Sequence, residues 1–213
     1  MPVLYAGTKR ILYIHVPKTG GTSVERLLSS MGEVVGVYTD YRRTLLPCTP
    51  QHFHADLLRQ TFSTTRGDIA NFDFVFMTVR DPIQRLSSEY RFQQTHRSRR
   101  RALYESVRYR DADAWARSAV KKFRRDPYLY DNHIRPQVDF LLPGTEVFRL
   151  EDGLRPISTR LHNLLDVTNG EELPRENSSQ IDPKGFSAST RNALREFYAE
   201  DYRVFYPHAS IDD

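Results

Sequence analysis

Short apolar runs alternate with amphipathic segments along this chain. The first run, Ile11 to Val16, is nearly continuous and predicts a strand buried on both faces of a sheet. A polar stretch with two glycines follows. A helix is expected after this stretch, and Gly32 is expected to end that helix. Apolar residues recur at helical spacing in that helix, at Val24, Leu27, Leu28 and Met31. The pattern therefore predicts a strand, a tight loop and a helix in succession.

A second apolar run, Phe72 to Val79, is rich in aromatic and β-branched residues and predicts another core strand. Pro82 suits the first turn of a helix, and Asp81 suits its N-cap. The apolar stripe of this helix consists of Ile83, Leu86 and Tyr90. This is a second strand–loop–helix unit.

The rest of the chain continues the alternation. The arginine-rich segment from His96 to Arg125 is predicted to be helical, a third strand is expected from Glu146 to Leu150, and Gly170 to Ser187 has the composition of a long loop. Ser187 or Ser189 is expected to cap a last helix. The inner faces of the three remaining helices are expected to carry Trp115, Ala119, Val120 and Phe123; then Ile157, Leu161, Leu164 and Leu165; then Leu194, Phe197 and Tyr198. We therefore expect a single α/β domain over residues 1–213, with a mainly parallel central sheet flanked by helices.

The composition fits a folded protein. The 213 residues suffice for one substantial domain, and 39% of them are hydrophobic. The formal net charge of +4 leans slightly toward anionic partners. The single cysteine, Cys48, cannot form an intramolecular disulfide. No signal-peptide pattern is present, and no apolar run approaches the roughly 20 residues that span a bilayer. These features predict a cytoplasmic protein without a transmembrane segment.

The sequence PKTGGTS, residues 17–23, carries the first candidate chemistry. A strand that turns sharply into a helix exposes backbone N–H groups, and with the helix dipole these form an anion site. Gly20 and Gly21 let the backbone approach a ligand closely. Hydroxyl groups and one positive charge are added by Thr19, Thr22, Ser23 and Lys18. The stretch is therefore predicted to hold a phosphate-like group.

The order of residues in this loop argues against a magnesium-dependent kinase or NTPase. In the nucleoside-triphosphate loop the lysine follows the glycines and the next Ser or Thr binds magnesium, whereas Lys18 precedes Gly20 and Gly21. Asp81, in the second strand–loop–helix motif, is assigned to a helix cap rather than to a metal. We expect no metal site, including at His52, His54 and Asp56, because the sequence suggests no further set of ligands beside these three.

A second anion contact is predicted after the second strand. Arg80 stands at the strand end and Ser88 on the following helix. Both can face the crevice at the carboxyl ends of the strands, where open α/β sheets bind ligands. An arginine fork with a serine hydroxyl is suited to a second phosphate.

Together, PKTGGTS and RDPIQRLSSEY resemble the 5′-phosphosulfate loop and the 3′-phosphate motif of sulfotransferases that use 3′-phosphoadenosine 5′-phosphosulfate (PAPS). The nearest likeness is to the carbohydrate branch that includes heparan sulfate 2-O-sulfotransferases and their soluble bacterial relatives. Later stretches resemble family landmarks in the same order: NHIRPQVDFL, VFRLEDGL, LPRENSS and FYAEDYRVFYP. The resemblance spans about Ile11 to Pro207 and implies a P-loop-like sulfotransferase fold.

The resemblance also implies roles for individual residues. The 5′-phosphosulfate would be held by Lys18, Thr19, Gly20, Gly21, Thr22 and Ser23, and the 3′-phosphate by Arg80 and Ser88. A sulfuryl group would pass from PAPS to an acceptor hydroxyl, with Lys18 neutralising the leaving phosphate oxygen. The acceptor is expected to be a carbohydrate, although lipid, small-alcohol and tyrosine hydroxyls stay open.

The acceptor hydroxyl needs a general base that works near neutral pH. His52 and His54 are two residues apart and would face one side of an extended segment, in a position that resembles the His-x-His of the 2-O-sulfotransferases. We expect His54 first and His52 second, with Glu25 or Asp56 as carboxylate alternatives. His15 is interpreted as structural, with contact to the edge of the cofactor as the alternative.

The basic stretch from His96 to Arg125 could line an anionic acceptor, bind nucleic acid or form a solvated helix face. Without a zinc finger or RNP motif, specific nucleic-acid binding is disfavoured. Two other functions stay open: an atypical phosphate-loop kinase, and a polyanion-binding protein without catalytic activity.

Overall fold

The computed structural model describes residues 1–37, 46–64, 68–95, 111–166 and 185–208. The chain forms two compact units. The first consists of Met1–Arg80 and Asp139–Ser178, and the second of Asp81–Val138 and Ser179–Asp213. Each unit has its own hydrophobic core. The expectation of one domain over the whole chain stays a prediction.

The first unit is built on a sheet that has five strands in the described part of the chain, in the order β3-β1-β2-β4-β5. These strands are β1 (Val3–Ala6), β2 (Lys9–Ile14), β3 (Glu33–Val35), β4 (Phe74–Val79) and β5 (Glu146–Arg149). β2, β4 and β5 run parallel, with Ile14 opposite Met77 and Val79 opposite Arg149. The three strands predicted from the apolar runs are therefore confirmed: β2 lies two residues earlier than its run, β4 begins two residues later than expected, and β5 ends one residue earlier.

The expectation of a mainly parallel sheet is not fully met, because β1 and β3 run antiparallel to their neighbours. β1 and β2 form a hairpin in which Ala6 pairs with Lys9, so the loop consists of Gly7 and Thr8. Gly7 adopts a φ of 58°, which suits a two-residue hairpin loop with glycine at its first position. A connection this short can only join antiparallel strands, and the sheet is mixed.

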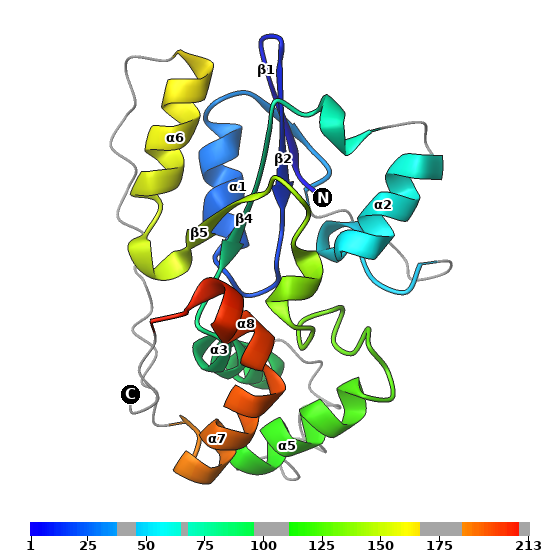
Figure 1. Ribbon diagram of the computed structural model, residues 1–213, viewed down its shortest axis with the longest axis vertical. Coiled ribbons are helices and arrows are strands. Elements are labelled where there is room, and N and C mark those ends of the chain that lie inside the picture. Colours follow the sequence, from blue (N-terminus) through cyan, green and yellow to red (C-terminus); the bar gives the residue numbers. More distant parts are fainter. Residues whose placement is uncertain (38–45, 65–67, 96–110, 167–184, 209–213) are drawn as a thin grey trace. The chain divides into compact units, whose positions relative to one another are not determined.

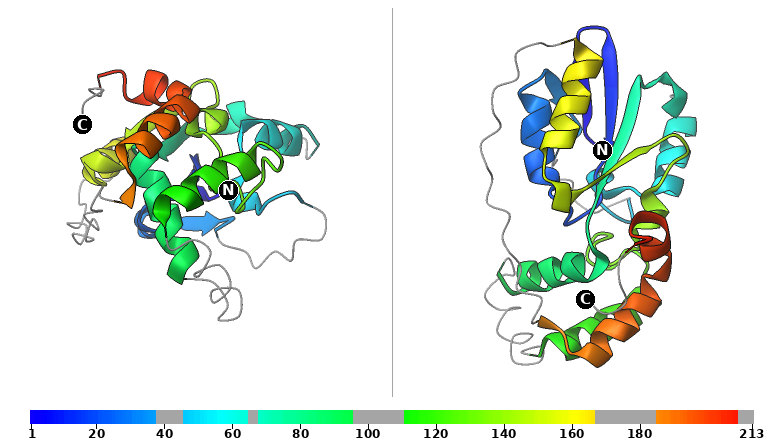
Figure 2. Two further views of the ribbon diagram at one scale, coloured as in Figure 1. Left: turned by 90° about the horizontal axis from the view of Figure 1, so that it is seen from below. Right: turned by 60° about the vertical axis from the view of Figure 1, so that its left-hand side comes forward.

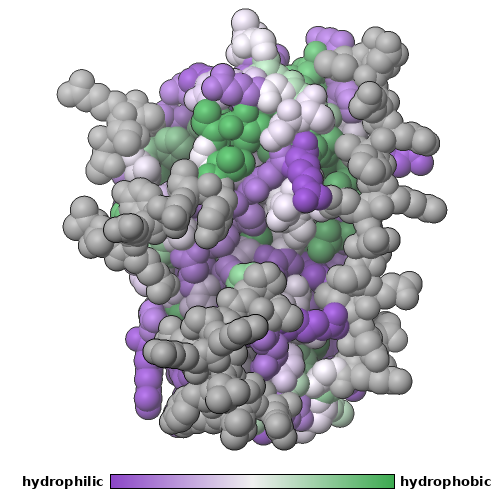
Figure 3. Space-filling model, turned by 180° about the vertical axis from the view of Figure 1, so that it is seen from behind, coloured by the Kyte–Doolittle hydropathy of each residue, from purple (hydrophilic) through white to green (hydrophobic). Residues whose placement is uncertain are grey.

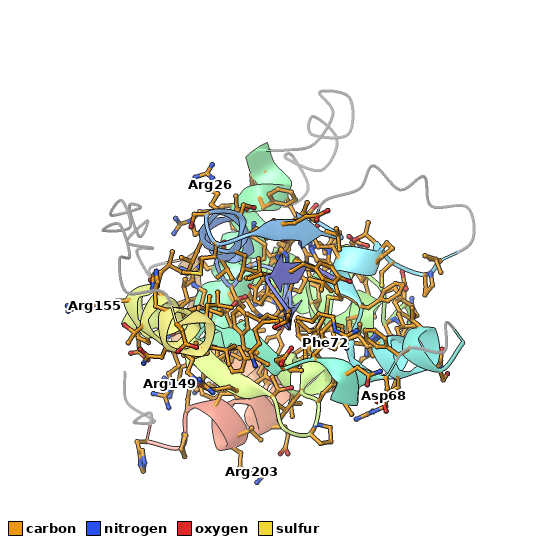
Figure 4. All side chains as sticks on the ribbon, turned by 90° about the horizontal axis from the view of Figure 1, so that it is seen from above. Arg26, Asp68, Phe72, Arg149, Arg155 and Arg203 are labelled. Atoms are coloured by element: carbon orange, nitrogen blue, oxygen red, sulfur yellow. The ribbon has the colours of Figure 1, made fainter. Side chains whose placement is uncertain are left out.

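Helices cover both faces of this sheet (Figures 1 and 2). α1 (Gly21–Ser29) and α6 (Arg155–Leu165) lie on one face, and α2 (Ala55–Thr64) on the other. The core on the first face contains Leu4, Ile11, Tyr13, Phe74 and Phe76 from the strands, Val24, Leu27 and Leu28 from α1, and Ile157 and Leu161 from α6. On α1, Arg26 projects away from this core, as the amphipathic pattern requires (Figure 4). Three 3-10 turns complete the unit: η1 (Pro50–His52), η2 (Ile69–Asn71) and η4 (Leu150–Asp152).

The second unit is helical. It contains α3 (Pro82–Thr95), α5 (Ala112–Phe123), α7 (Ala188–Phe197) and α8 (Ala199–Phe205), and η3 (Gln137–Phe140) crosses the sequence boundary between the units. Its core is formed by Ile83, Leu86, Trp115, Ala116, Ala119, Ile134, Phe186, Leu194 and Tyr198. The Asp81 carboxylate accepts a hydrogen bond from the Gln84 N–H at 2.8 Å, which confirms the predicted cap. Ser187 caps α7 through the Thr190 N–H at 3.3 Å.

The surface of the described residues is mostly polar. The exposed large hydrophobic side chains among them are Tyr5 and Val35, on β1 and β3. In the view of Figure 3, hydrophilic residues surround smaller apolar areas. None of the helices in the described ranges is long and apolar enough to cross a membrane.

Candidate functional site

The loop between β2 and α1 is held in an unusual backbone conformation. Lys18 has a φ of 68° and Gly20 a φ of 85°, so both lie in the left-handed region. Glycine adopts this region freely, but a residue with a Cβ is destabilised there by about 1–2 kcal/mol. Strain of this kind is concentrated at binding sites. The loop therefore keeps Lys18 in a conformation that favourable contacts elsewhere must offset.

Backbone N–H groups converge at the start of α1. Gly20 is the N-cap residue, and its carbonyl accepts from the N–H groups of Ser23 at 3.0 Å and Val24 at 3.2 Å. The N–H groups of Gly21 and Thr22 come before these two, and helix geometry leaves such first-turn donors without intrahelical partners. With the positive end of the helix dipole, they form an anion site. Thr22 and Ser23 belong to the first turn of α1, so their hydroxyls lie near this end of the helix. Thr22 is exposed and Ser23 is half-buried.

Thr19 is fully buried, and its hydroxyl is part of a hydrogen-bond chain inside the protein. The Thr19 hydroxyl donates to the Val16 carbonyl at 2.8 Å and lies 2.8 Å from the Thr78 hydroxyl, which lies 2.7 Å from the Tyr13 hydroxyl. Because Thr19 uses its proton on Val16, Thr78 must donate to Thr19 and Tyr13 to Thr78. Burial raises the Tyr13 pKa well above its usual value, so Tyr13 keeps the proton that it donates. The Thr19 hydroxyl is thus committed to contacts inside the protein.

The same loop lies at the carboxyl ends of all three parallel strands. The Thr19–Thr78 bond joins it to β4, which ends at Val79. A Cβ on Gly20 would lie 2.6 Å from Leu150 Cδ1, directly after β5. This edge of the sheet is where open α/β folds bind ligands.

His15 lies between β2 and the loop and is held by a carboxylate. Its Nδ1 is 2.8 Å from Glu25 Oε1, and the Gln51 amide nitrogen donates to the same oxygen at 2.5 Å. The two nitrogens are themselves only 2.9 Å apart, so both crowd the same carboxylate oxygen. Since a carboxylate can only accept, the hydrogen-bond network assigns a proton to Nδ1. The ring therefore turns its Nε2 edge away from Glu25.

The Nε2 edge of His15 lies against Gly21. A Cβ built on Gly21 would be 2.1 Å from His15 Nε2 and 2.3 Å from Cε1, far below ordinary contact distances. Only a glycine can stand at the first position of α1 beside this ring. The second glycine of the loop is therefore required by packing.

The electrostatics of this cluster favour an ionised Glu25. Partial burial by itself raises the Glu25 pKa, but the hydrogen bond and positive potential from His15 lower it, and Gln51 and His52 act in the same direction. The net result is a pKa below the usual value.

The two histidines predicted as base candidates occupy different environments. His52 is half-buried at the end of η1, where its ring meets the His15 ring edge-on with centroids 5.1 Å apart and its Nδ1 lies 3.3 Å from the Thr49 hydroxyl. His54 is only 6% exposed, and its carbonyl accepts from the Leu58 N–H. Because η1 is a 3-10 turn, the expectation of an extended segment is wrong for His52, and spacing alone does not set the two rings on one side.

The carboxylate alternatives are both engaged. Glu25 is bonded to His15, and the exposed Asp56 pairs with Arg59 at 2.8 Å. The structure thus joins His15, which the sequence suggested was structural, with Glu25 and His52 in one cluster beside the loop.

Arg80 follows β4 directly, so it shares the sheet edge with the loop, and it is half-buried. Ser88 is half-buried on α3 in the second unit. Its joint action with Arg80 stays a prediction.

Other residues of RDPIQRLSSEY have structural partners in the second unit. Arg85, 1% exposed, donates to the carbonyls of His133 at 3.3 Å and Arg135 at 2.5 Å. Glu89, fully buried, accepts from His133 Nδ1 at 2.6 Å. These contacts join α3 to the segment NHIRPQVDFL.

The same segment is bonded to the closing stretch FYAEDYRVFYP. Asp201 accepts from the N–H groups of Gln137 and Val138, both at 2.9 Å, and the Tyr198 hydroxyl donates to the Ile134 carbonyl at 2.9 Å. Burial raises the Asp201 pKa, although Arg85 and these N–H groups oppose the shift. Two of the late sequence landmarks, NHIRPQVDFL and FYAEDYRVFYP, therefore contribute buried polar contacts to the second unit.

Two sequence predictions lie partly outside the described residues. They concern positions 96–110 of the arginine-rich segment and positions 170–184 of the expected long loop, which include LPRENSS. Within the described part, α5 buries Trp115 and Ala119 as expected.

Comparison with known families gives one match. A family model described as "Sulfotransferase family" matches residues 1–207. No curated protein and no solved structure matches the chain.

Proposed function

Because this chain belongs to the sulfotransferase family, we propose that it transfers a sulfuryl group from PAPS to a hydroxyl group of a carbohydrate acceptor. Family membership supports sulfuryl transfer in general, an activity of the EC 2.8.2 type. The observation that carries the proposal is the β2–α1 loop, in which a strained Lys18 and the first N–H groups of α1 stand at one sheet edge with Arg80.

The donor contacts follow from this arrangement. The N–H groups of Thr19, Gly20, Gly21 and Thr22 and the hydroxyls of Thr22 and Ser23 hold the 5′-phosphosulfate. Arg80 binds the 3′-phosphate with its guanidinium, aided by Ser88, and so distinguishes PAPS from nucleotides without that group. Thr19 acts through its backbone, because its hydroxyl is already bonded to Val16 and Thr78.

The transfer is an in-line displacement at sulfur. The acceptor oxygen forms a new bond to sulfur while the bond from sulfur to the bridging phosphate oxygen breaks, and the electron pair stays on that oxygen. Lys18 neutralises the charge that develops there, and the hydroxyl proton passes to a histidine. Positioning and charge stabilisation supply most of the rate enhancement in such reactions.

His52 is the first candidate for that histidine and His54 the second, which reverses the order expected from the sequence. A general base must come within hydrogen-bond distance of the hydroxyl. His52 is half-buried and lies beside His15, whereas His54 is nearly enclosed. Separate His52→Gln and His54→Gln variants identify the base by which one loses turnover while still binding the donor product.

A carbohydrate acceptor is proposed from the motifs that resemble the 2-O-sulfotransferase branch. Transfer of radiolabelled sulfate from PAPS to de-sulfated heparan or chondroitin chains, but not to a tyrosine peptide or a simple alcohol, would support this class. Transfer to the peptide alone would exclude the carbohydrate proposal and leave sulfuryl transfer intact.

Donor identity is tested by thermal unfolding with 3′-phosphoadenosine 5′-phosphate (PAP), AMP and Mg·ATP. A ligand at 100 times its Kd stabilises the folded state by about 2.7 kcal/mol, which raises the Tm of a protein of this size by roughly 5–10 °C. We expect this shift with PAP, a small one with AMP, and loss of the difference in Arg80→Ala. Equal stabilisation by AMP, or a requirement for Mg·ATP, would overturn the PAPS proposal.

The catalytic role of Lys18 has a matched control in the same unit. Lys18→Ala should abolish transfer from PAPS, whereas Lys9→Ala should leave it unchanged, because Lys9 is exposed and pairs with Asp73 at 3.1 Å. Turnover at the wild-type rate in Lys18→Ala would remove Lys18 from the mechanism.

A further inference from the structure

We propose that His15 is a positioning residue, which fixes the donor loop at Gly21 and joins it to the base candidate His52. This inference rests on the proposed binding of PAPS by the loop. It assigns a function in positioning the loop to a side chain that the sequence context favoured as structural.

The His15 ring is fixed on every side that the structure describes. Glu25 and Gln51 hold its Nδ1 edge through the shared carboxylate oxygen. The Tyr13 ring stacks on it with centroids 5.6 Å apart and an interplanar angle of 26°. The ring is 7% exposed. A side chain held in this way has one rotamer and can act as a rigid stop.

The loop rests against this stop at Gly21 and is anchored separately at Thr19. His15 Nε2 occupies the space where a Cβ of Gly21 would lie, so α1 cannot shift toward the strand at its first residue. Two residues earlier in the loop, the Thr19 hydroxyl is bonded to Val16 and Thr78. Between and beside these anchors stand the two left-handed residues, Lys18 and Gly20. The anion-binding N–H groups are thereby held in position before any ligand arrives, which lowers the entropy lost on binding.

His15 also links the two sides of the reaction. Its ring meets His52 edge-on at 5.1 Å, while its opposite edge faces the loop. A shift of about 1 Å in a reacting group can lower an enzymatic rate about 100-fold. Loss of the His15 ring should therefore weaken donor binding and also lower kcat.

The test separates this function from a structural one by means of His15→Asn. An asparagine amide can donate to Glu25 as Nδ1 does, but it lacks the ring atoms that face Gly21 and His52. We expect the urea midpoint of unfolding to stay near the wild-type value. The Kd for PAP, measured by calorimetry, should rise about 10-fold or more, and the amides of residues 20–24 should exchange hydrogen faster in the absence of ligand. His15→Ala should lose both stability and affinity.

His162→Asn is the matched control. His162 belongs to the same unit, on α6, and its Nδ1 lies 2.8 Å from the Ser158 carbonyl. Its replacement should leave the Kd for PAP unchanged.

Each outcome is decisive. If the wild-type protein does not bind PAP, the proposed function itself fails. If it binds PAP and His15→Asn binds equally well with unchanged amide exchange, His15 does not position the loop. If affinity falls in the variants only as far as their folded fraction falls, the role of His15 is structural and the inference is wrong.

Discussion

Replacement of Gly21 by alanine should damage the loop through a steric clash alone. The new Cβ would lie 2.1 Å from His15 Nε2, about 1.3 Å short of the 3.4 Å at which ordinary van der Waals contact begins. Gly21 is not among the glycines with a positive φ, so no backbone strain adds to the clash. The ring cannot yield without breaking its bond to Glu25 at 2.8 Å.

The size of the effect depends on whether the ring stays in place and the site is overpacked, or the ring moves and its hydrogen bond to Glu25 breaks. Overpacking a filled site destabilises a protein by typically 1–3 kcal/mol, and a hydrogen bond to a charged group contributes about 1.5–3 kcal/mol. We expect Gly21→Ala to lower the free energy of unfolding by about 2–4 kcal/mol in urea titrations and to weaken PAP binding at least 10-fold.

Gly185→Ala is the control, because its Cβ would lie 3.5 Å from Ser87 Oγ, an ordinary contact. The double variant His15→Ala, Gly21→Ala tests the cause directly. If the ring is what excludes the methyl group, Gly21→Ala should add almost nothing once the ring is gone. Wild-type stability and PAP affinity in the single variant would refute the reasoning.

Three further predictions concern the same unit. Lys18→Gly should raise the free energy of unfolding by up to about 1 kcal/mol, since glycine relieves the left-handed strain, and should abolish transfer; a fall of more than about 1 kcal/mol would contradict the strain. Because the Glu25 pKa is lowered by folding, its stabilisation is present above the usual value of 4.5 and is lost as the pH falls through the folded-state pKa. The stability difference between wild type and Glu25→Gln should therefore shrink on acidification in urea titrations from pH 7 to 3, and a constant difference would exclude this linkage. Thr78→Val keeps the shape but leaves buried hydroxyl partners unsatisfied, so unfolding should become easier by about 1–3 kcal/mol; an unchanged urea midpoint would count against the Tyr13–Thr78–Thr19 chain.

In the parallel half of the sheet, β2 and β4 could be predicted from the sequence because each has six residues that are mostly apolar and buried. β4 and β5 lie within the predicted runs, and β2 overlaps its run from Ile11 to Ile14. The caps formed by Asp81 and Ser187 were expected from residue type. The antiparallel half was missed. β1 and β3 have four and three residues, too few for alternation to be distinguished from chance. The Gly7–Thr8 pair between apolar segments was a usable signal for the hairpin.

The loop was predictable but its support was not. PKTGGTS carries its own signature, whereas the contacts that fix it join residues far apart in sequence. Glu25 is 10 positions from His15, and Gln51 is 36 positions from His15. Thr78 is 59 positions from Thr19. Such pairs depend on strand register and helix phase, which periodicity does not specify to within one residue. The Glu25 contact could have been suggested, because it stands one helical turn after Gly21.

The β1–β2 hairpin has a consequence for the choice of fragment boundaries. The recognisable motifs begin at Ile11, so a shortened chain would naturally be started there. Such a fragment would lack β1, which pairs with β2 on one side and β3 on the other and contributes the fully buried Leu4. One edge of β2 would then present unpaired N–H and C=O groups to other chains, the arrangement that promotes edge-to-edge aggregation. Insolubility of that fragment would reflect the exposed strand and would say nothing about the loop at residues 17–23.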